Sequence, residues 1–176
     1  DVNGDGAISA AIDKQTIKNL NPKFYGGLQN TIRFGNLEFD FLFQFVKQEN
    51  FNENSGNAMP GTMNNQPSGV LAHWLNPGDE GPYQGYSNSN GTRSLANTRL
   101  SQSDAAISDA SYICLKNISL SYKLPQKKKK KMTCRLSIQG QNVLTFTNYR
   151  GIDPEFKITG YLPPLRIYTT SIQINF

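Results

Sequence analysis

Residues 36–46 read NLEFDFLFQFV, and this stretch decides the fold class. Every second side chain is apolar, and four of the five in that set are phenylalanine. One set comprises Leu37, Phe39, Phe41, Phe43 and Phe45, and the other comprises Glu38, Asp40, Leu42, Gln44 and Val46. Because successive side chains of a strand point to opposite sides, this alternation predicts a β-strand with two chemically different faces.

Strand-like patterns continue on both sides of this stretch. Residues 23–34 read KFYGGLQNTIRF, and the pair Gly35-Asn36 that follows is a two-residue hairpin turn. Similar patterns run through 111–125 (SYICLKNISLSYKLP), 132–148 (MTCRLSIQGQNVLTFTN) and 166–176 (RIYTTSIQINF). The sequence therefore predicts an all-β fold, an antiparallel meander of about five long strands.

The alternation allows two interpretations. In a soluble β-sandwich the phenylalanine face would form the core, whereas in a transmembrane β-barrel it would face lipid and the polar face would line the lumen. The predicted strands of about 10 to 14 residues exceed the usual five to six, and a tilted barrel strand needs about 9 to 11 to cross a bilayer. Strand length and the alternation of short turns with long loops favour the barrel.

The charge of the chain is unevenly distributed. Of the 18 basic residues in the 176-residue chain, five form the run Lys127–Lys131. The charge of this run equals the net charge of the whole chain, +5, so the rest of the chain is neutral. Such a run can bind nucleic acid or anionic lipid, but a solvated turn between strands is the favoured interpretation. Because no aromatic residues interleave with the lysines, we predict no nucleic-acid partner.

The cysteine and histidine content argues against disulfides and zinc. A hairpin turning at the lysine run places Cys114 opposite Asn142 and Cys134 opposite Tyr122, too far apart for a disulfide. The chain has a single histidine, His73, and no CxxC pair, whereas zinc needs about four nitrogen or sulfur ligands.

The first 13 residues, DVNGDGAISAAID, resemble the start of an EF-hand calcium loop. Such a loop takes ligands from positions 1, 3, 5, 7 and 9 and a bidentate carboxylate at position 12. The candidate calcium ligands are Asp1, Asn3, Asp5, the Ala7 carbonyl, Ser9 and Asp13. Position 12 is Ile12, however, and Asp13 comes one residue late, so calcium binding would be weak.

A plain turn competes with the calcium site and is the favoured interpretation. The pairs Asn3-Gly4 and Asp5-Gly6 are turn formers, since glycine accepts positive φ and Asx side chains bond nearby amides. A short helix from Ser9 to Asn19, with Ser9 as its N-cap, is expected to follow.

Residues 48–109 show no periodicity, and loops of that length are usually functional or disordered. His73 and Trp74 are weak ligand-binding candidates here, since a tryptophan can stack on a sugar, although packing is the favoured role of Trp74. Asp153 and Glu155 flank Pro154, where a turn is favoured over paired-carboxylate chemistry. No nucleophile motif is present, so we expect no enzyme.

Several of these pieces together resemble one protein family. The stretches DVNGDGAI (1–8), NPKFYGGLQNTIRFGNLEFDFLFQF (21–45), NPGDEGP after Trp74, DASYICLKNISLSYKLP (109–125), QNVLTFTNYRGIDPE (141–155) and the final strand occur in an order similar to that in SusC/RagA-type TonB-linked outer-membrane proteins of Bacteroidetes. Three features depart from the pattern, namely Cys114, where the family usually has arginine, the strongly basic turn, and the calcium-like loop, which is one residue out of register.

The resemblance implies that the chain is a C-terminal segment of a nutrient transporter. It implies a 22-stranded barrel with an N-terminal plug, importing oligosaccharides or peptides with energy from TonB, in contact with outer-membrane lipid and a SusD-like lipoprotein. The segments expected are then a DxNxDG-type turn and short helix at 1–20, a hairpin at 21–47, a long extracellular loop at 48–109, a hairpin with a Lys-rich periplasmic turn at 110–147, an outer loop at 148–163 and a C-terminal barrel strand at 164–176. The alternative is a secreted or surface all-β glycan-binding module.

Overall fold

The structure is a computed structural model that describes residues 1–56, 58–88, 90–125, 132–156 and 162–176. Its contacts divide the chain into two compact units, which are considered separately below. One unit is a sheet built from Asn21–Gln48 and Ala110–Phe176, and the other combines Asp1–Leu20 with Glu49–Asp109.

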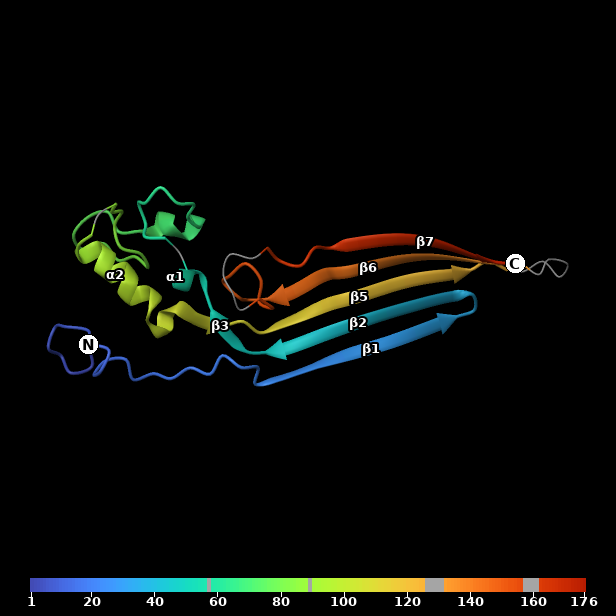
Figure 1. The fold of residues 1–176 in the computed structure, drawn as a ribbon, viewed down its shortest axis with the longest axis horizontal. Helices are drawn as coiled ribbons and strands as arrows, with labels where there is room; N and C mark the ends of the chain where they lie inside the picture. Colours follow the sequence, from blue (N-terminus) through green and yellow to red (C-terminus); the bar gives the residue numbers. More distant parts are fainter. Residues whose placement is uncertain (57, 89, 126–131, 157–161) are drawn as a thin grey trace. The chain divides into compact units, whose positions relative to one another are not determined.

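The sheet unit contains five antiparallel strands in the order β1-β2-β5-β6-β7 (Figure 1). Their bounds are β1 Phe24–Phe34, β2 Leu37–Lys47, β5 Tyr112–Lys123, β6 Thr133–Thr147 and β7 Ile167–Asn175. Each strand of this sheet pairs with its neighbours along the order, so the predicted all-β antiparallel meander of five long strands is confirmed.

The first hairpin turns within two residues. Phe34 pairs with Leu37, and Gly35 has a φ of +58° in the left-handed region that favours glycine. A type II′ hairpin turn places glycine at this first central position, because its twist matches that of the flanking strands. The turn fixes the register, and the register puts all the phenylalanines of β2 on one face.

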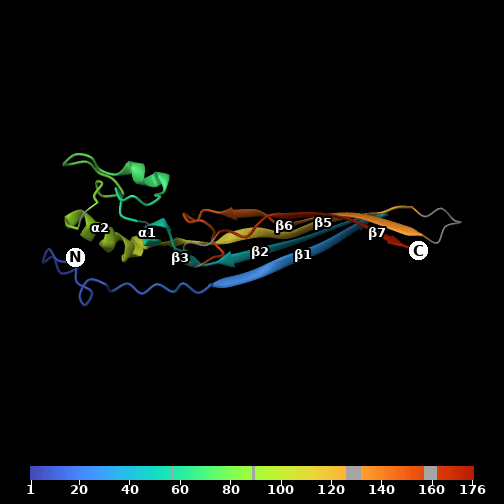
Figure 2. The same ribbon diagram turned by 45° about the horizontal axis from the view of Figure 1, so that its top comes forward.

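The five strands form a single twisted layer, which Figure 2 shows from a second direction. A sandwich would need a second sheet packed on the phenylalanine face, and the described residues of this unit supply none. The sheet is also not closed, since β1 and β7 each pair on one side only among the described strands. Among the residues that the structure describes in this unit, the cluster of buried apolar side chains is small: Val46, Tyr112 and Cys114.

The second unit has short elements. They are β3 Glu49–Phe51, α1 Glu53–Gly56, the 3-10 turn η1 Ser68–Ala72, α2 Thr92–Ser101, η2 Asp104–Ala106 and β4 Ile107–Asp109, with β3 antiparallel to β4. Asparagine side chains hold part of it: Asn52 Nδ2 donates to the Ala105 carbonyl at 2.9 Å, and Asn52 Oδ1 accepts from the Asn54 amide at 2.9 Å. Such local side-chain bonds order a stretch that lacks hydrophobic periodicity.

Among the described residues, no helix has both the length and the apolar character needed to cross a membrane.

Two sequence-based expectations are wrong. The helix expected from Ser9 to Asn19 does not form, and residues 10–13 make only a turn in which the Asp13 amide donates to the Ser9 carbonyl at 3.0 Å. In the second hairpin Cys114 lies opposite Thr145, not Asn142, and Tyr122 lies opposite Leu136, not Cys134. The expected turn at Lys127–Lys131 lies outside the described residues.

Candidate functional site

The register assembles one continuous apolar face across the sheet. Residues that pair directly share a face, so the phenylalanine side of β2 extends onto both neighbours. The apolar side chains on this face are Leu28, Ile32 and Phe34 of β1, Leu37, Phe39, Phe41, Phe43 and Phe45 of β2, Ile113, Leu115, Ile118, Leu120 and Tyr122 of β5, Leu136, Ile138, Leu144 and Phe146 of β6, and Tyr168, Ile172 and Ile174 of β7. Many of them are exposed, including Ile138 at 59% and Ile172 at 69%.

The opposite face is polar, and its side chains bond sideways between strands. Glu38 Oε2 lies 2.8 Å from Arg33 Nε on β1 and 3.7 Å from Arg135 Nη2 on β6. Asp40 accepts hydrogen bonds from Thr31 Oγ1 at 2.5 Å and from Ser119 Oγ at 3.2 Å. Glu38 is thus paired with two arginines, and Asp40 is hydrogen-bonded by two hydroxyl groups.

Two bulges interrupt the ladders at the same level of the sheet. Lys116 of β5 has no partner in the register with β2, and Asn142 of β6 has a φ of +52° where the β5–β6 register shifts. Bulges re-aim side chains and bend strands. The Lys116 ammonium here meets Glu155 of the following connection, with Nζ 2.5 Å from Oε2.

The connection after β6 bonds onto the sheet through the Asp153-Pro154-Glu155 stretch. Gln48 Nε2 donates to the Pro154 carbonyl at 2.6 Å, and the Glu155 amide donates to Asp153 Oδ1 at 2.8 Å. The second contact forms an Asx turn, in keeping with the turn favoured for this stretch, but the ion pair to Lys116 and the bond to Gln48 were not predicted. No sequence signal relates Gln48, Lys116 and Glu155, which lie 39 residues or more apart.

Tyr149 begins the same connection. Burial, and next the negative charge of Asp153, raise the pKa of its phenol above the ordinary value of 10.0. The phenol therefore remains neutral and can donate a hydrogen bond throughout the physiological range.

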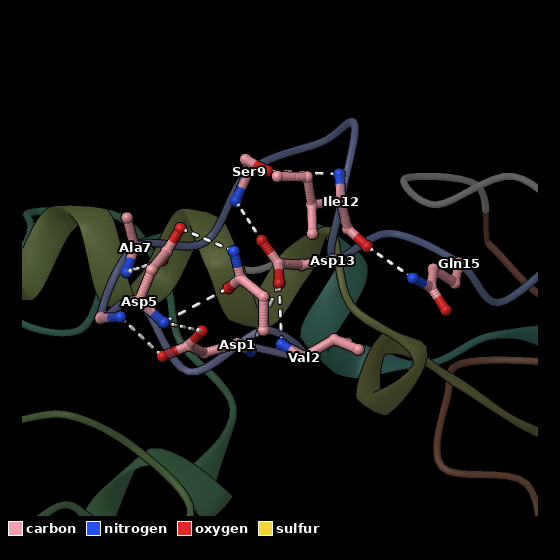
Figure 3. Close-up of polar contacts among 10 residues, drawn as sticks. Asp1, Val2, Asp5, Ala7, Ser9, Ile12, Asp13 and Gln15 are labelled. Atoms are coloured by element: carbon pink, nitrogen blue, oxygen red, sulfur yellow. Dashed lines mark hydrogen bonds and ion pairs between the residues drawn. The ribbon is translucent and has the colours of Figure 1, made fainter.

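The Asp1–Asp13 loop folds around its own carboxylates (Figure 3). Asp13, although one residue late for an EF-hand, turns inward, and its oxygens accept from the Val2 amide at 2.8 Å and the Ser9 amide at 2.6 Å. Asp1 accepts from the Asp5 and Gly6 amides, and Asp5 accepts from the Ala7 amide and the Asn3 side chain. Hydrogen bonds from backbone amides lower the pKa of both Asp5 and Asp13 below 3.8.

Within the described residues, no three His, Cys, Asp or Glu side chains converge on one possible metal position. The predicted calcium set of Asp1, Asn3, Asp5, Ala7, Ser9 and Asp13 lies in one loop, but its carboxylates engage amides. Calcium binding at this loop stays a prediction.

His73 and Trp74 lie in the second unit beside Tyr86 and Arg93. The His73 ring stacks on Tyr86 with centroids 3.8 Å apart, and the Arg93 guanidinium carbon lies 5.5 Å from the centroid of the Trp74 ring. Arg93 Nη1 also donates to the Tyr86 carbonyl at 2.7 Å. One side of the indole therefore already carries a cation–π contact, and sugar binding by this pair stays a prediction.

The two cysteines are free thiols; Cys114 is buried on the polar side of β5, and Cys134 is partly exposed.

Comparison with known proteins gives relatives of one kind. No protein-family model matches the chain. TonB-dependent receptor P39 of Formosa agariphila is 31% identical over 166 residues and TonB-dependent receptor P3 of the same organism is 34% identical over 161, each match covering 88% of this chain. The chain spans only 15% of the length of either relative.

Solved structures of similar fold include the RagAB peptide importer. In its closed-closed state the TM-score is 0.72 at 22% identity, over 97% of this chain and 19% of the importer chain. In its open-open state the TM-score is 0.68 over 90% of this chain. These likenesses support the barrel-wall interpretation of the open sheet.

Proposed function

From its similarity to TonB-dependent receptors over 88% of its length, we propose that the chain belongs to the SusC/RagA type and forms part of the wall of a barrel that imports nutrients across the outer membrane of a Gram-negative bacterium. The single observation that carries the proposal is the chemical division of the sheet. Its apolar face suits lipid, and its hydrogen-bonded polar face suits a water-filled lumen.

The open edges of the sheet support the same proposal. A membrane-inserted strand must have both sides paired, since lipid offers no hydrogen bonds to free amides and carbonyls. The outer edges of β1 and β7 are therefore expected to pair with further strands of a longer protein, and the short match to its relatives agrees with this.

The substrate and partners rest on the family. We propose import of oligosaccharides or peptides together with a SusD-like surface lipoprotein, and energy transfer from TonB through a part of the receptor that this chain does not include. The fold neighbour RagAB is a peptide importer, which favours peptides. The family is one of receptors and transporters, so the chain is not assigned an enzymatic activity.

Fractionation of cells with an antibody against residues 149–156 tests the location. We expect a band in the outer-membrane fraction several times larger than the 19.6 kDa of this chain. A soluble protein of about the chain's own mass would overturn the proposal and leave the glycan-binding module. Uptake of labelled oligopeptides and of labelled oligosaccharides, with and without TonB, then separates the two substrate classes.

A further inference from the structure

The connection after β6 reaches back over the polar face of the sheet. Thr147 Oγ1 donates to the Ser111 carbonyl at 2.8 Å where β6 ends, and Gln48 Nε2 and Lys116 Nζ hold the Asp153–Glu155 stretch further on. Gln48 follows β2, whereas Lys116 belongs to β5, so the connection after β6 is bonded to two other parts of the meander. We call residues 149–156 the strap.

Buried side chains mark the part of the polar face at which the strap is bonded. A single-layer sheet leaves both faces open, yet Val46, Tyr112 and Cys114 on the polar side are buried, with Cys114 only 3% exposed. Pro154 and Gln48 are buried as well, and they touch through the 2.6 Å hydrogen bond between them. The buried patch on the polar face thus lies at the level where the strap bonds to the sheet.

The fastening differs from the rest of the sheet. The five strands are joined by regular backbone ladders, whereas the Asp153–Glu155 stretch is joined to the sheet by two side chains, those of Gln48 and Lys116. Lys116 sits at the bulge, where the irregular register allows its side chain to reach the strap instead of a strand neighbour. Breaking the ion pair therefore leaves every strand pairing intact.

We propose that the strap is a releasable cover of the polar face, with the Lys116–Glu155 ion pair as its latch. When the latch opens, the Tyr112–Cys114 patch becomes accessible from the polar side. The consequence for transport, a narrower passage with the strap closed, rests on the proposed barrel function. The cover itself depends only on the sheet and is tested separately.

Cys114 provides the readout. The test uses the full-length receptor in outer-membrane vesicles, with Cys134→Ser removing the other thiol of this chain, and measures the rate of Cys114 labelling by a water-soluble maleimide. We expect slow labelling of the otherwise unchanged receptor and a rate on the order of fivefold higher in Glu155→Gln, because the amide keeps an acceptor for Lys116 but loses the charge of a partly solvated ion pair. The same rate in both proteins would overturn the latch.

Two further variants separate the latch from general destabilisation. The exchanged pair Lys116→Glu with Glu155→Lys should restore slow labelling, whereas a protein that is merely destabilised would label faster still. Arg33→Gln is the control, because it breaks an ion pair with Glu38 on the same face. Glu38 lies six residues along β2 from Gln44, which pairs with Cys114. This variant should leave the labelling rate of Cys114 unchanged. Fast labelling in Arg33→Gln, or no rescue by the exchange, would contradict the proposal even if the receptor is found in the outer membrane.

Discussion

Arg135 of β6 reaches across β5 to Glu38 of β2, with 3.7 Å between Nη2 and Oε2. Ser121 of β5 lies opposite Glu38 in the register and is only 7% exposed. We infer that the long Arg135 side chain passes over this small residue. The ion pair thus joins two strands that do not pair with each other.

Ser121→Leu should separate Arg135 from Glu38 by filling the space between them. The loss should be about 1 kcal/mol or less, because the pair is partly solvated. A double-mutant cycle with Glu38→Gln and Arg135→Gln, measured by urea unfolding of the receptor in lipid, gives the coupling energy in both backgrounds. An unchanged coupling energy in Ser121→Leu would show that the arginine does not pass over the serine.

Arginine at adjacent positions of β6 tests which face meets lipid. Ile138 lies on the apolar face and Gln139 on the polar face. Ile138→Arg should cost about 2–4 kcal/mol if it lies near the bilayer midplane, and Gln139→Arg should cost little. Heat-modifiable migration of the folded receptor on gels reports the folded fraction of each variant. Equal losses at the two positions would contradict the assignment of faces.

Gly26 lacks a side chain, and the Phe45 ring packs against its backbone on the apolar face. A Cβ added at Gly26 would lie 2.6 Å from Phe45 Cζ, and the Phe45 ring makes an edge contact with Phe24 at 6.4 Å between centroids. Gly26→Ala should push the ring off and destabilise the receptor by about 0.5–1.5 kcal/mol, the worth of such an aromatic pair. Gly27→Ala is the comparison: its nearest neighbour, the Phe43 carbonyl oxygen, is 3.3 Å away, which is a tight contact but requires a smaller shift than the 2.6 Å at Gly26. Urea unfolding should separate the two variants.

The Asp1–Asp13 loop should loosen in acid. Because the folded pKa of Asp5 and of Asp13 lies below 3.8, their ionised forms stabilise the loop above that pH, and the stabilisation is lost as the pH falls through the lower folded values. Amide hydrogen exchange at Val2 and Ser9 can be followed from pH 6 to pH 3. After correction for the intrinsic exchange rate, the exchange of both amides should rise only at the acid end of this range. Asp13→Asn should show the raised exchange already at pH 6.

Calcium gives the same loop a second test. If the predicted site binds the ion, adding calcium in millimolar amounts should slow exchange at these amides and move the acid transition lower, since a bound cation favours ionised carboxylates. A chelator should reverse both effects. Identical exchange with calcium and with chelator would remove the calcium site and leave the hydrogen-bonded turn.

Arg93 should control the environment of Trp74, the single tryptophan of this chain. Arg93→Ala removes the cation–π contact and the bond to the Tyr86 carbonyl, worth about 0.5–1 kcal/mol each at a partly exposed site. The emission of Trp74 is obtained by subtracting the spectrum of a Trp74→Phe variant from that of the receptor. In Arg93→Ala this emission should shift toward longer wavelength. Arg93→Lys keeps the charge but not the planar group, and it should restore the signal only in part.

The sequence by itself determined the strands, their two faces and the first hairpin. The alternation over Leu37–Lys47 fits the two-residue period of a strand and does not fit a helix. The two-residue turn Gly35-Asn36 then sets the register between β1 and β2. It did not determine the second register, because Lys127–Lys131 marks a turn only approximately and the bulges at Lys116 and Asn142 add residues without a compositional signal. Ser9 does cap a turn, since its Oγ accepts from the Ile12 amide at 3.2 Å, but the turn ends at Asp13 and the expected helix does not continue to Asn19.

Only the tertiary structure brought Gln48, Lys116 and Glu155 together. Their contacts join positions far apart in the chain, and a glutamine, a lysine and a glutamate carry no pattern that relates them before the sheet exists. Alternation is a property of neighbouring residues and can be read along the chain, whereas the strap depends on which strand ends the meander places side by side. The two-faced strands can therefore be predicted from the local sequence, whereas the contacts of the strap with the sheet depend on the tertiary fold.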